Sequence, residues 1–157
     1  MTFKVAVEAS PNLHNSWQPG LRALRSRDRQ HIDAQPTANL RGSIDVDAAW
    51  RPIQPNANRW DFGIAYQHSD RQEEFVYWVE THTANDSQVK VVIRKAQWLL
   101  AWLKNGGRPL NKFERDIVWV SSGATKFTLT APQKKQMAAA GLRNCGSRLR
   151  IRGQRGD

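Results

Sequence analysis

The stretch RWDFGIAYQHSDRQEEFVYWVETHT, residues 59–83, decides the fold of this chain. Two runs of mostly apolar residues, 60–66 and 75–82, flank a polar segment, and this pattern predicts two antiparallel strands joined by a turn. Each run nevertheless contains one carboxylate, Asp61 in the first and Glu80 in the second. A charged side chain is costly among buried apolar residues unless it is paired, so these two acids need a chemical explanation.

The spacing of the two runs predicts that the acids face each other. If the turn is centred between Asp70 and Arg71, Asp61 is paired directly with Glu80 across the hairpin. Directly opposed residues have Cβ atoms roughly 4.5–5.5 Å apart, and like charges at that separation destabilise a sheet. Either one of the two carboxyl groups is therefore protonated, or a cation lies between them.

His82 follows Glu80 by two residues and therefore shares its face of the strand. The small residue Gly63 leaves space for a ligand near these groups. Two carboxylates suit a hard cation such as Mg²⁺ or Mn²⁺, which lowers the pKa of bound water and stabilises charge on a phosphoryl group. Asp45 and Asp47, on the preceding segment, are candidates for a further ligand. In the competing interpretation the acids simply face solvent, as carboxylates in strands often do.

The remaining segments predict an α/β domain with a packed interior. Hydrophobic residues make up 39% of the chain, and the seven tryptophans indicate a substantial core. Residues 3–8 read as a short strand or an irregular arm. From the apolar periodicity we expect helices over 13–31 and 86–104, and Pro132 at a first turn with Gly141 past an end predicts a helix over 131–140. We expect strands over 44–50, 60–66, 75–82, 116–121 and, at an edge, 149–151.

The charge distribution favours a polyanionic partner. The formal net charge is +10, and the excess of basic residues is concentrated at the two ends of the chain. We expect nucleic-acid contacts from Arg22, Arg25, Arg27, Arg29, Arg148, Arg150 and Arg152. Lysine and arginine contacts of this kind bind phosphates, so they provide affinity and salt dependence without sequence selectivity.

Length and composition are those of one globular domain over residues 1–157, with a basic C-terminal tail at 143–157. The single cysteine, Cys145, excludes an internal disulfide framework. The longest apolar run is far too short to span a membrane, and the N-terminus is not typical of a signal peptide. We therefore expect a cytoplasmic protein that does not associate with membranes.

The element order and the acid pair resemble the PD-(D/E)xK nuclease superfamily. Members of that family have a core of helix, three strands, helix and strand, with an aspartate on the second core strand and a (D/E)-x-K motif on the third. Asp61 in WDFGIAY matches the first position, and Glu80-Thr81-His82 in VYWVETHT matches the second. The resemblance covers about residues 13–122. It implies a restriction-endonuclease-like α/β fold, a mixed central sheet flanked by helices with an αβββαβ core.

Histidine at position 82 departs from the family pattern, which has lysine there. A neutral histidine lacks the permanent charge of lysine, although it can orient water or act as a base. A lysine from the following helix is another source of the cation, with Lys90 and Lys95 as candidates. Gln97 on the same helix is a further polar residue that can reach the site.

The resemblance implies a metal-dependent nuclease that acts on DNA or RNA. In this interpretation Asp61 and Glu80 bind Mg²⁺ or Mn²⁺, His82 assists the attacking water, and Lys95 belongs to the catalytic group. Because such folds often pair, a homodimer through exposed tryptophans is also expected. The alternative is a catalytically inactive module on the same fold that binds nucleic acid or protein, which the missing lysine favours. A third interpretation is an unrelated basic α/β protein whose hairpin acids face solvent.

Overall fold

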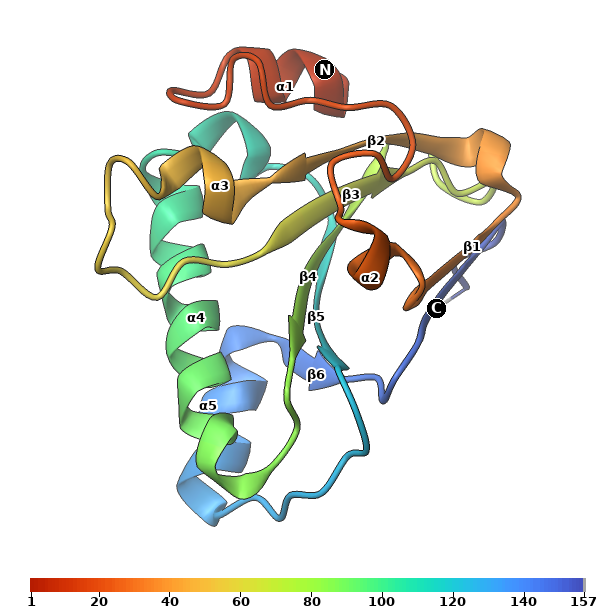
Figure 1. Ribbon diagram of the computed structural model, residues 1–157. Coiled ribbons are helices and arrows are strands. Elements are labelled where there is room, and N and C mark those ends of the chain that lie inside the picture. Colours follow the sequence, from red (N-terminus) through yellow and green to blue (C-terminus); the bar gives the residue numbers. More distant parts are fainter. Residues whose placement is uncertain (157) are drawn as a thin grey trace.

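The main sheet of the domain is mixed. The computed structural model describes residues 1–156, and within them five strands form this sheet in the order β2-β3-β4-β5-β6 (Figure 1). The strands are β2 (Leu40–Asp45), β3 (Phe62–Tyr66), β4 (Phe75–His82), β5 (Arg115–Ser121) and β6 (Leu142–Asn144). The pairs β2–β3 and β3–β4 are antiparallel, whereas β4–β5 and β5–β6 are parallel. The expected α/β class with a mixed sheet is therefore confirmed.

Helices cover one face of the main sheet, and a two-stranded sheet covers the other. On the first face lie α1 (Phe3–Glu8), α4 (Asp86–Lys104) and α5 (Ala131–Ala140), which share one apolar core (Figure 1). On the second face, β1 (Ile32–Gln35) pairs in parallel with β7 (Leu149–Arg152), next to the short helix α2 (Ser26–Arg29). The remaining short elements are η1 (Thr37–Asn39), α3 (Val46–Trp50) and η2 (Arg108–Leu110). The sheet is thus flanked by long helices on one face and mainly by the two-stranded sheet on the other.

The hairpin of β3 and β4 has the register that the sequence predicts. Phe62 pairs with Val79, and Gly63 pairs with Trp78. Trp60 precedes β3 and packs with the core beneath α4, whereas Phe62 belongs to the core on the opposite face. In a strand over 60–66 these two side chains would share one face, but β3 begins two residues later, at Phe62, so they lie on opposite faces.

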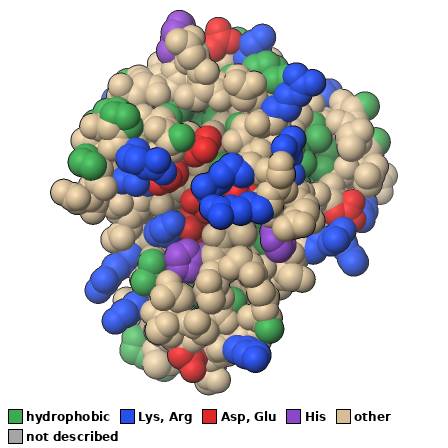
Figure 2. Space-filling model, viewed as in Figure 1, with side chains coloured by type: hydrophobic (Ala, Val, Ile, Leu, Met, Phe, Trp, Pro, Cys, Tyr) green, Lys and Arg blue, Asp and Glu red, His purple; other side chains and the backbone are tan. Residues whose placement is uncertain are grey.

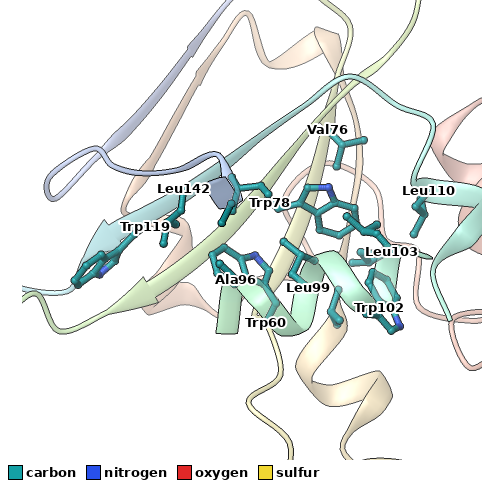
Figure 3. Packing of buried hydrophobic residues seen from close by; sticks show 14 of the residues in the cluster. Trp60, Val76, Trp78, Ala96, Leu99, Trp102, Leu103, Leu110, Trp119 and Leu142 are labelled. Carbon is teal, nitrogen blue, oxygen red and sulfur yellow. The ribbon is translucent and has the colours of Figure 1, made fainter. Parts of the chain in front are cut away.

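The helix α4 has the bounds that its apolar spacing predicts. Its buried residues Leu99 and Leu103 face the sheet, and Figure 3 shows them lying towards Val76 and Trp78 of β4. Residues three and four apart share a helix face, which explains why this stripe of apolar residues meets the sheet. Among the helices of residues 1–156, none is both long and apolar enough to cross a membrane.

The long helix expected over residues 13–31 does not form. Gly20 adopts a positive φ of 54° directly after Pro19, and this conformation interrupts a helix. The segment is tied to β2 instead, because Gln18 pairs with Ser43 through backbone hydrogen bonds of 3.0 and 2.9 Å. The N–H of Ala23 also donates to Ser43 Oγ at 3.1 Å. Contacts with the sheet therefore outweigh the local helical pattern, and only α2 is helical.

The strand expected over residues 44–50 ends early. β2 stops at Asp45, whose carboxylate accepts a hydrogen bond of 2.9 Å from the N–H of Ala48. This contact caps the N-terminus of α3, so residues 46–50 are helical. Asp45, which the sequence places inside the strand predicted over 44–50, therefore marks the end of that strand.

Residues 3–8 form the helix α1 instead of a strand or an arm. The hydroxyl of Thr2 accepts a hydrogen bond of 3.2 Å from the N–H of Val5 and caps the helix. Phe3, Ala6 and Val7 are its buried residues, a spacing that gives a helix one apolar face.

The basic tail 143–157 is folded onto the domain as far as residue 156, and Asp157 lies outside the described residues. Within this segment, β6 extends the main sheet and β7 pairs with β1, so the expected final strand forms in the smaller sheet. The Arg143 guanidinium binds Asp116 at 2.8 Å, and that of Arg155 lies 4.7 Å from the centre of the Phe75 ring. Much of the tail therefore contributes to the fold.

Most tryptophan side chains are in the interior. Five of the seven, Trp50, Trp60, Trp78, Trp102 and Trp119, are buried, and Trp17 and Trp98 are partly buried. Only Trp17 and Trp98 therefore retain surface for an interface of the expected kind. The homodimer itself stays a prediction.

Candidate active site

Asp61 and Glu80 meet at the end of the β3–β4 hairpin. The backbone N–H of Asp61 donates to Glu80 Oε1 at 3.2 Å, and the N–H of Thr81 donates to Asp61 Oδ2 at 3.2 Å. Each carboxylate thus binds the backbone of the opposite segment. The side chain of Glu80 is 1% exposed and that of Asp61 is 14% exposed. The interpretation in which both acids simply face solvent is therefore wrong.

Lys95 extends from α4 to both acids. Its Nζ lies 2.5 Å from Glu80 Oε2 and 4.0 Å from Asp61 Oδ1. Of the candidates that the sequence offers on this helix, Lys95 is thus the one that reaches the acids, whereas Lys90 and Gln97 are exposed. A buried carboxylate requires such a partner, because an unpaired charge in the interior is strongly destabilising.

His82 joins the same group through two hydrogen bonds. Its Nδ1 lies 3.3 Å from Glu80 Oε2, and its Nε2 lies 2.6 Å from Gln88 Oε1. Both neighbours are oxygen acceptors, which suits an imidazolium ring that donates from both nitrogens. The hydrogen bond to Glu80 raises the pKa of His82 above its usual value, although burial opposes this, and the bond to Gln88 adds to it. We call Asp61, Glu80, His82, Gln88 and Lys95 the acid site.

Burial and neighbouring charges shift the pKa values of both Asp61 and Lys95 in the acid site. Burial and the neighbouring charge of Glu80 together raise the pKa of Asp61 to about 8, even though Lys95 and the Thr81 N–H act in the other direction. Burial opposes the charged form of Lys95, but the carboxylates of Glu80 and Asp61 outweigh it and raise its pKa. At neutral pH the site therefore favours a protonated Asp61 beside a cationic Lys95.

Asp45 and Asp47 do not join the acid site as ligands. The carboxylate of Asp45 caps α3, as described above. That of Asp47 pairs with Arg59 at 2.9 Å and with Arg51 at 2.5 Å. The sequence-based suggestion that one of them supplies a third carboxylate was wrong, because both side chains are used by local structure.

A hollow of about 370 Å³ adjoins the acid site at His82. Arg25, Arg27 and His31 line it from the segment around α2, together with Asp28, which pairs with Arg25 at 3.3 Å. The hydroxyl residues Thr83 and Ser122 follow the ends of β4 and β5. We call this hollow the basic pocket. Figure 2 shows acidic side chains near the middle of one face, with Lys and Arg side chains around them and histidines beside them. Two of the arginines expected to bind phosphates thus lie next to the candidate catalytic residues.

The other candidate arginines are distributed over different surfaces. Arg22 lines a separate hollow beside α3, and Arg29 donates to Ser26 within α2 at 3.1 Å. Arg148 and Arg150 line a third hollow near the β6–β7 connection. Arg152 binds Asp33 at 2.8 Å, which joins β7 to β1. The predicted set is therefore not one continuous patch, and Arg152 has a structural partner.

Gln88 is the residue of the acid site that the sequence did not reveal. It lies in the first turn of α4, six residues after His82, and the connection between β4 and α4 brings it back to the histidine ring. A glutamine near a helix start is common, so its type and position carry no signal by themselves.

The donor atoms of the acid site fit a hard cation. Within residues 1–156 no hydrogen bond to Asp61 Oδ1 occurs, and the crowding of two carboxylates is what an added cation relieves. The same residues contain no group of three or more His, Cys, Asp or Glu side chains arranged for a metal. Magnesium is nevertheless commonly bound through one or two carboxylates, with water and substrate phosphate completing its shell.

No protein-family model, curated protein sequence or solved structure matches this chain.

Proposed function

We propose that this protein is a metal-dependent nuclease that hydrolyses phosphodiester bonds at the acid site. The observation that carries the proposal is the convergence of two carboxylates and an ammonium: Asp61 directly before β3, Glu80 on β4 and Lys95 on α4. Buried, strongly perturbed ionisable groups of this kind concentrate at functional sites. A structural salt bridge needs only one acid for one lysine, so the second carboxylate is the unexplained component.

We further propose a restriction-endonuclease-like fold. Its support is the succession of β2, β3, β4, α4 and β5 along the chain, in which a parallel crossover through α4 follows an antiparallel hairpin. In the family that this chain resembles, an aspartate, a glutamate and a lysine share one site. Here the lysine comes from α4 at position 95, and histidine occupies position 82.

Each residue of the acid site has a role in this proposal. Asp61 and Glu80 hold Mg²⁺ or Mn²⁺, which when bound supplies an acidified water and charge stabilisation at the phosphoryl group. Lys95 orients Glu80 and places a positive charge where the phosphate gains negative charge. His82 is the residue that assists the attacking water, and its Nε2 becomes available for this when the contact with Gln88 opens.

Nucleic acid is the proposed partner. The net charge of +10 favours a polyanion, and the basic pocket provides arginine and hydroxyl groups next to His82. Arginine and hydroxyl side chains are frequent donors to phosphate oxygens. The substrate phosphate also supplies metal ligands that the chain itself does not, which explains why two carboxylates are enough.

The proposal is tested by cleavage of labelled DNA and RNA in the presence of Mg²⁺ or Mn²⁺. Asp61→Asn should remove activity by several orders of magnitude while leaving salt-sensitive binding intact, because the amide cannot replace a metal-binding carboxylate. Glu73→Gln, which changes an exposed acid, is the matched control and should retain full activity. Full activity in Asp61→Asn would refute the site.

The same assay separates the nuclease from an inactive binding module. The observation in favour of the module is that Lys95 already satisfies Glu80 at 2.5 Å. Wild-type protein that binds nucleic acid tightly but cleaves neither DNA nor RNA with either metal would support the module. Cleavage that depends on Asp61 would support the nuclease.

A further inference from the structure

A second concave site lies on α4, beyond the acid site. Its volume is about 210 Å³, and it is lined by the indole rings of Trp50, Trp98 and Trp102 together with the polar residues Gln54 and Asn105. We call it the tryptophan pocket. Gln54, Ala101 and Asn105 of its lining are exposed, so the hollow is open at the surface and accessible to a ligand.

The rings of the tryptophan pocket are held in fixed positions. Trp98 is stacked on Trp102 with ring centres 5.9 Å apart and an angle of 8°, and Trp50 meets Trp102 edge-on at 6.1 Å. Trp98 Nε1 donates to Gln54 Oε1 at 2.7 Å, which fixes the outermost ring. Gly106 allows this packing, because a Cβ there would lie 2.5 Å from the Trp50 ring. The pocket is thus a preformed aromatic surface.

Two buried donors of the pocket residues have no acceptor. Within residues 1–156, Nε1 of Trp50 and Nε1 of Trp102 are without hydrogen-bond partners, in side chains of residues that are 8% and 4% exposed. The same holds for Nε1 of Trp60 and Trp78, which do not line the pocket, so unpaired indole donors are a feature of the tryptophan core as a whole. What the pocket offers a ligand is its aromatic surface, which a planar ring can occupy by stacking.

The pocket is aligned with the acid site along one helix. Trp98 and Trp102 follow Lys95 by three and seven residues, so all three side chains lie on the same side of α4. With a rise of about 1.5 Å per residue, the two rings are about 4.5 and 10.5 Å further along the axis than Lys95. A stacked strand advances about 3.4 Å per nucleotide. The pocket is therefore about one to three nucleotides from the lysine.

We propose that the tryptophan pocket binds an unpaired base of the substrate strand. This inference rests on the proposed nuclease function and specifies its substrate as single-stranded nucleic acid, or a duplex with an unpaired base close to the cleaved bond. Only an unpaired base can leave its own stack to occupy the pocket, and base stacking on aromatic side chains is a common mode of single-strand binding. Arg94, exposed and one helical turn before Trp98, lies where the strand backbone would pass.

The test uses the full chain with Asp61→Asn, which blocks cleavage, and oligonucleotides that contain the fluorescent base 2-aminopurine. The substrates are a single strand of DNA or RNA, a fully paired duplex, and a duplex with one unpaired 2-aminopurine. Stacking in the pocket should quench the fluorescence of the unpaired base and not that of the paired one. Adding Trp98→Ala should weaken single-strand binding by roughly 5- to 150-fold, the range for loss of one stacked base.

Two control substitutions make the outcome decisive. Trp98→Phe keeps an aromatic ring and should retain most of the affinity, and Trp17→Ala removes a partly buried tryptophan that lies elsewhere and should retain it fully. Equal affinity of Trp98→Ala and Trp98→Phe would overturn the pocket, as would equal quenching of paired and unpaired bases. Circular dichroism verifies that each variant is folded.

The outcome is also separable from that of the proposed nuclease. If the wild-type protein cleaves duplex and single strands equally and Trp98→Ala does not change the rate, the pocket proposal fails and the nuclease stands. If quenching depends on Trp98 but no cleavage occurs with any metal, the nuclease fails and the pocket remains as the site of a single-strand-binding module.

Discussion

At the scale of single residues, Asp61 is subject to opposing influences. Burial and the charge of Glu80 favour its neutral form and raise its pKa to about 8, whereas Lys95 favours the carboxylate. A proton or a metal ion can each relieve the repulsion between the two acids. Metal binding at this site must therefore compete with protonation of Asp61.

The raised pKa of Asp61 makes stability depend on pH in the absence of metal. Because the folded state holds the proton up to about pH 8 and an unfolded aspartate loses it near pH 4, folding is favoured at low pH. Between these values the free energy of unfolding should fall by up to about 1.4 kcal/mol per pH unit through this residue. In Asp61→Asn this contribution is absent, so the variant should gain stability relative to wild type as pH rises.

Urea denaturation from about pH 5 to about pH 9, without divalent metal, measures this difference. Glu73→Gln is again the control, since its exposed side chain has no part in the acid site. If the free energy of unfolding changed with pH in the same way in Asp61→Asn and in wild type, the raised pKa of Asp61 would be contradicted.

At the scale of elements, the sequence predicts those segments whose local pattern and tertiary contacts agree. The hairpin strand β4 and the helix α4 have the expected bounds, because their apolar spacing matches the surfaces they cover. The helix α5 has them because Pro132 lies in its first turn and Gly141 ends it with a positive φ. The segment 13–31 has a helical pattern too, but its backbone pairs with β2, which no local signal reveals. β1 and β6 were missed since both are short and depend on partners distant in sequence.

The acid site, too, could be predicted from the sequence only in part. The opposition of Asp61 and Glu80 follows from strand register alone, so the sequence predicts it. Lys95 could be named only as one of several candidates on the next helix, because the choice among them depends on how α4 is rotated against the sheet. Gln88 was not predictable because it depends on the path of the β4–α4 connection.

The close packing within the hairpin gives a prediction at this scale. The space for a ligand expected at Gly63 is filled, because a Cβ there would lie 2.6 Å from the ring of Trp78 on β4, and both residues are buried. We expect Gly63→Ala to lower the free energy of unfolding by about 1–3 kcal/mol, the usual cost of overpacking. Gly123→Ala, at a site where nothing lies within 4 Å, is the control and should change stability little. Equal stability of the two variants in urea would contradict this account of the hairpin.

At the scale of the whole molecule, the basic residues divide into structural and available groups. Arg143, Arg152 and Arg155 bind acids that hold the C-terminal segment on the domain. Arg27 lines the basic pocket, and within residues 1–156 it has no ion-pair partner. Only some of the arginines that contribute to the net charge of +10 are therefore available to bind phosphates.

Two substitutions distinguish these groups. Arg27→Ala should weaken nucleic-acid binding and reduce the slope of log affinity against log salt by about 0.7–0.9, as expected for loss of one phosphate contact. Arg152→Ala should leave that slope unchanged and lower the melting temperature, because it removes the contact between β7 and Asp33. Binding isotherms at several salt concentrations and thermal melts measure both effects. A reduced slope in Arg152→Ala with unchanged stability would reverse the assignment.

The central claim, that the opposed acids hold a metal ion, is tested most directly by calorimetric titration of Mn²⁺. Wild-type protein should bind Mn²⁺ at about pH 8.5, and its affinity should fall by roughly tenfold per pH unit below about 8, as Asp61 takes up its proton. Asp61→Asn should not bind Mn²⁺ at about pH 8.5 or at any lower pH, whereas Glu73→Gln should bind it like wild type. Equal binding of Mn²⁺ by wild type and Asp61→Asn, or no binding by wild type at the higher pH, would contradict the account.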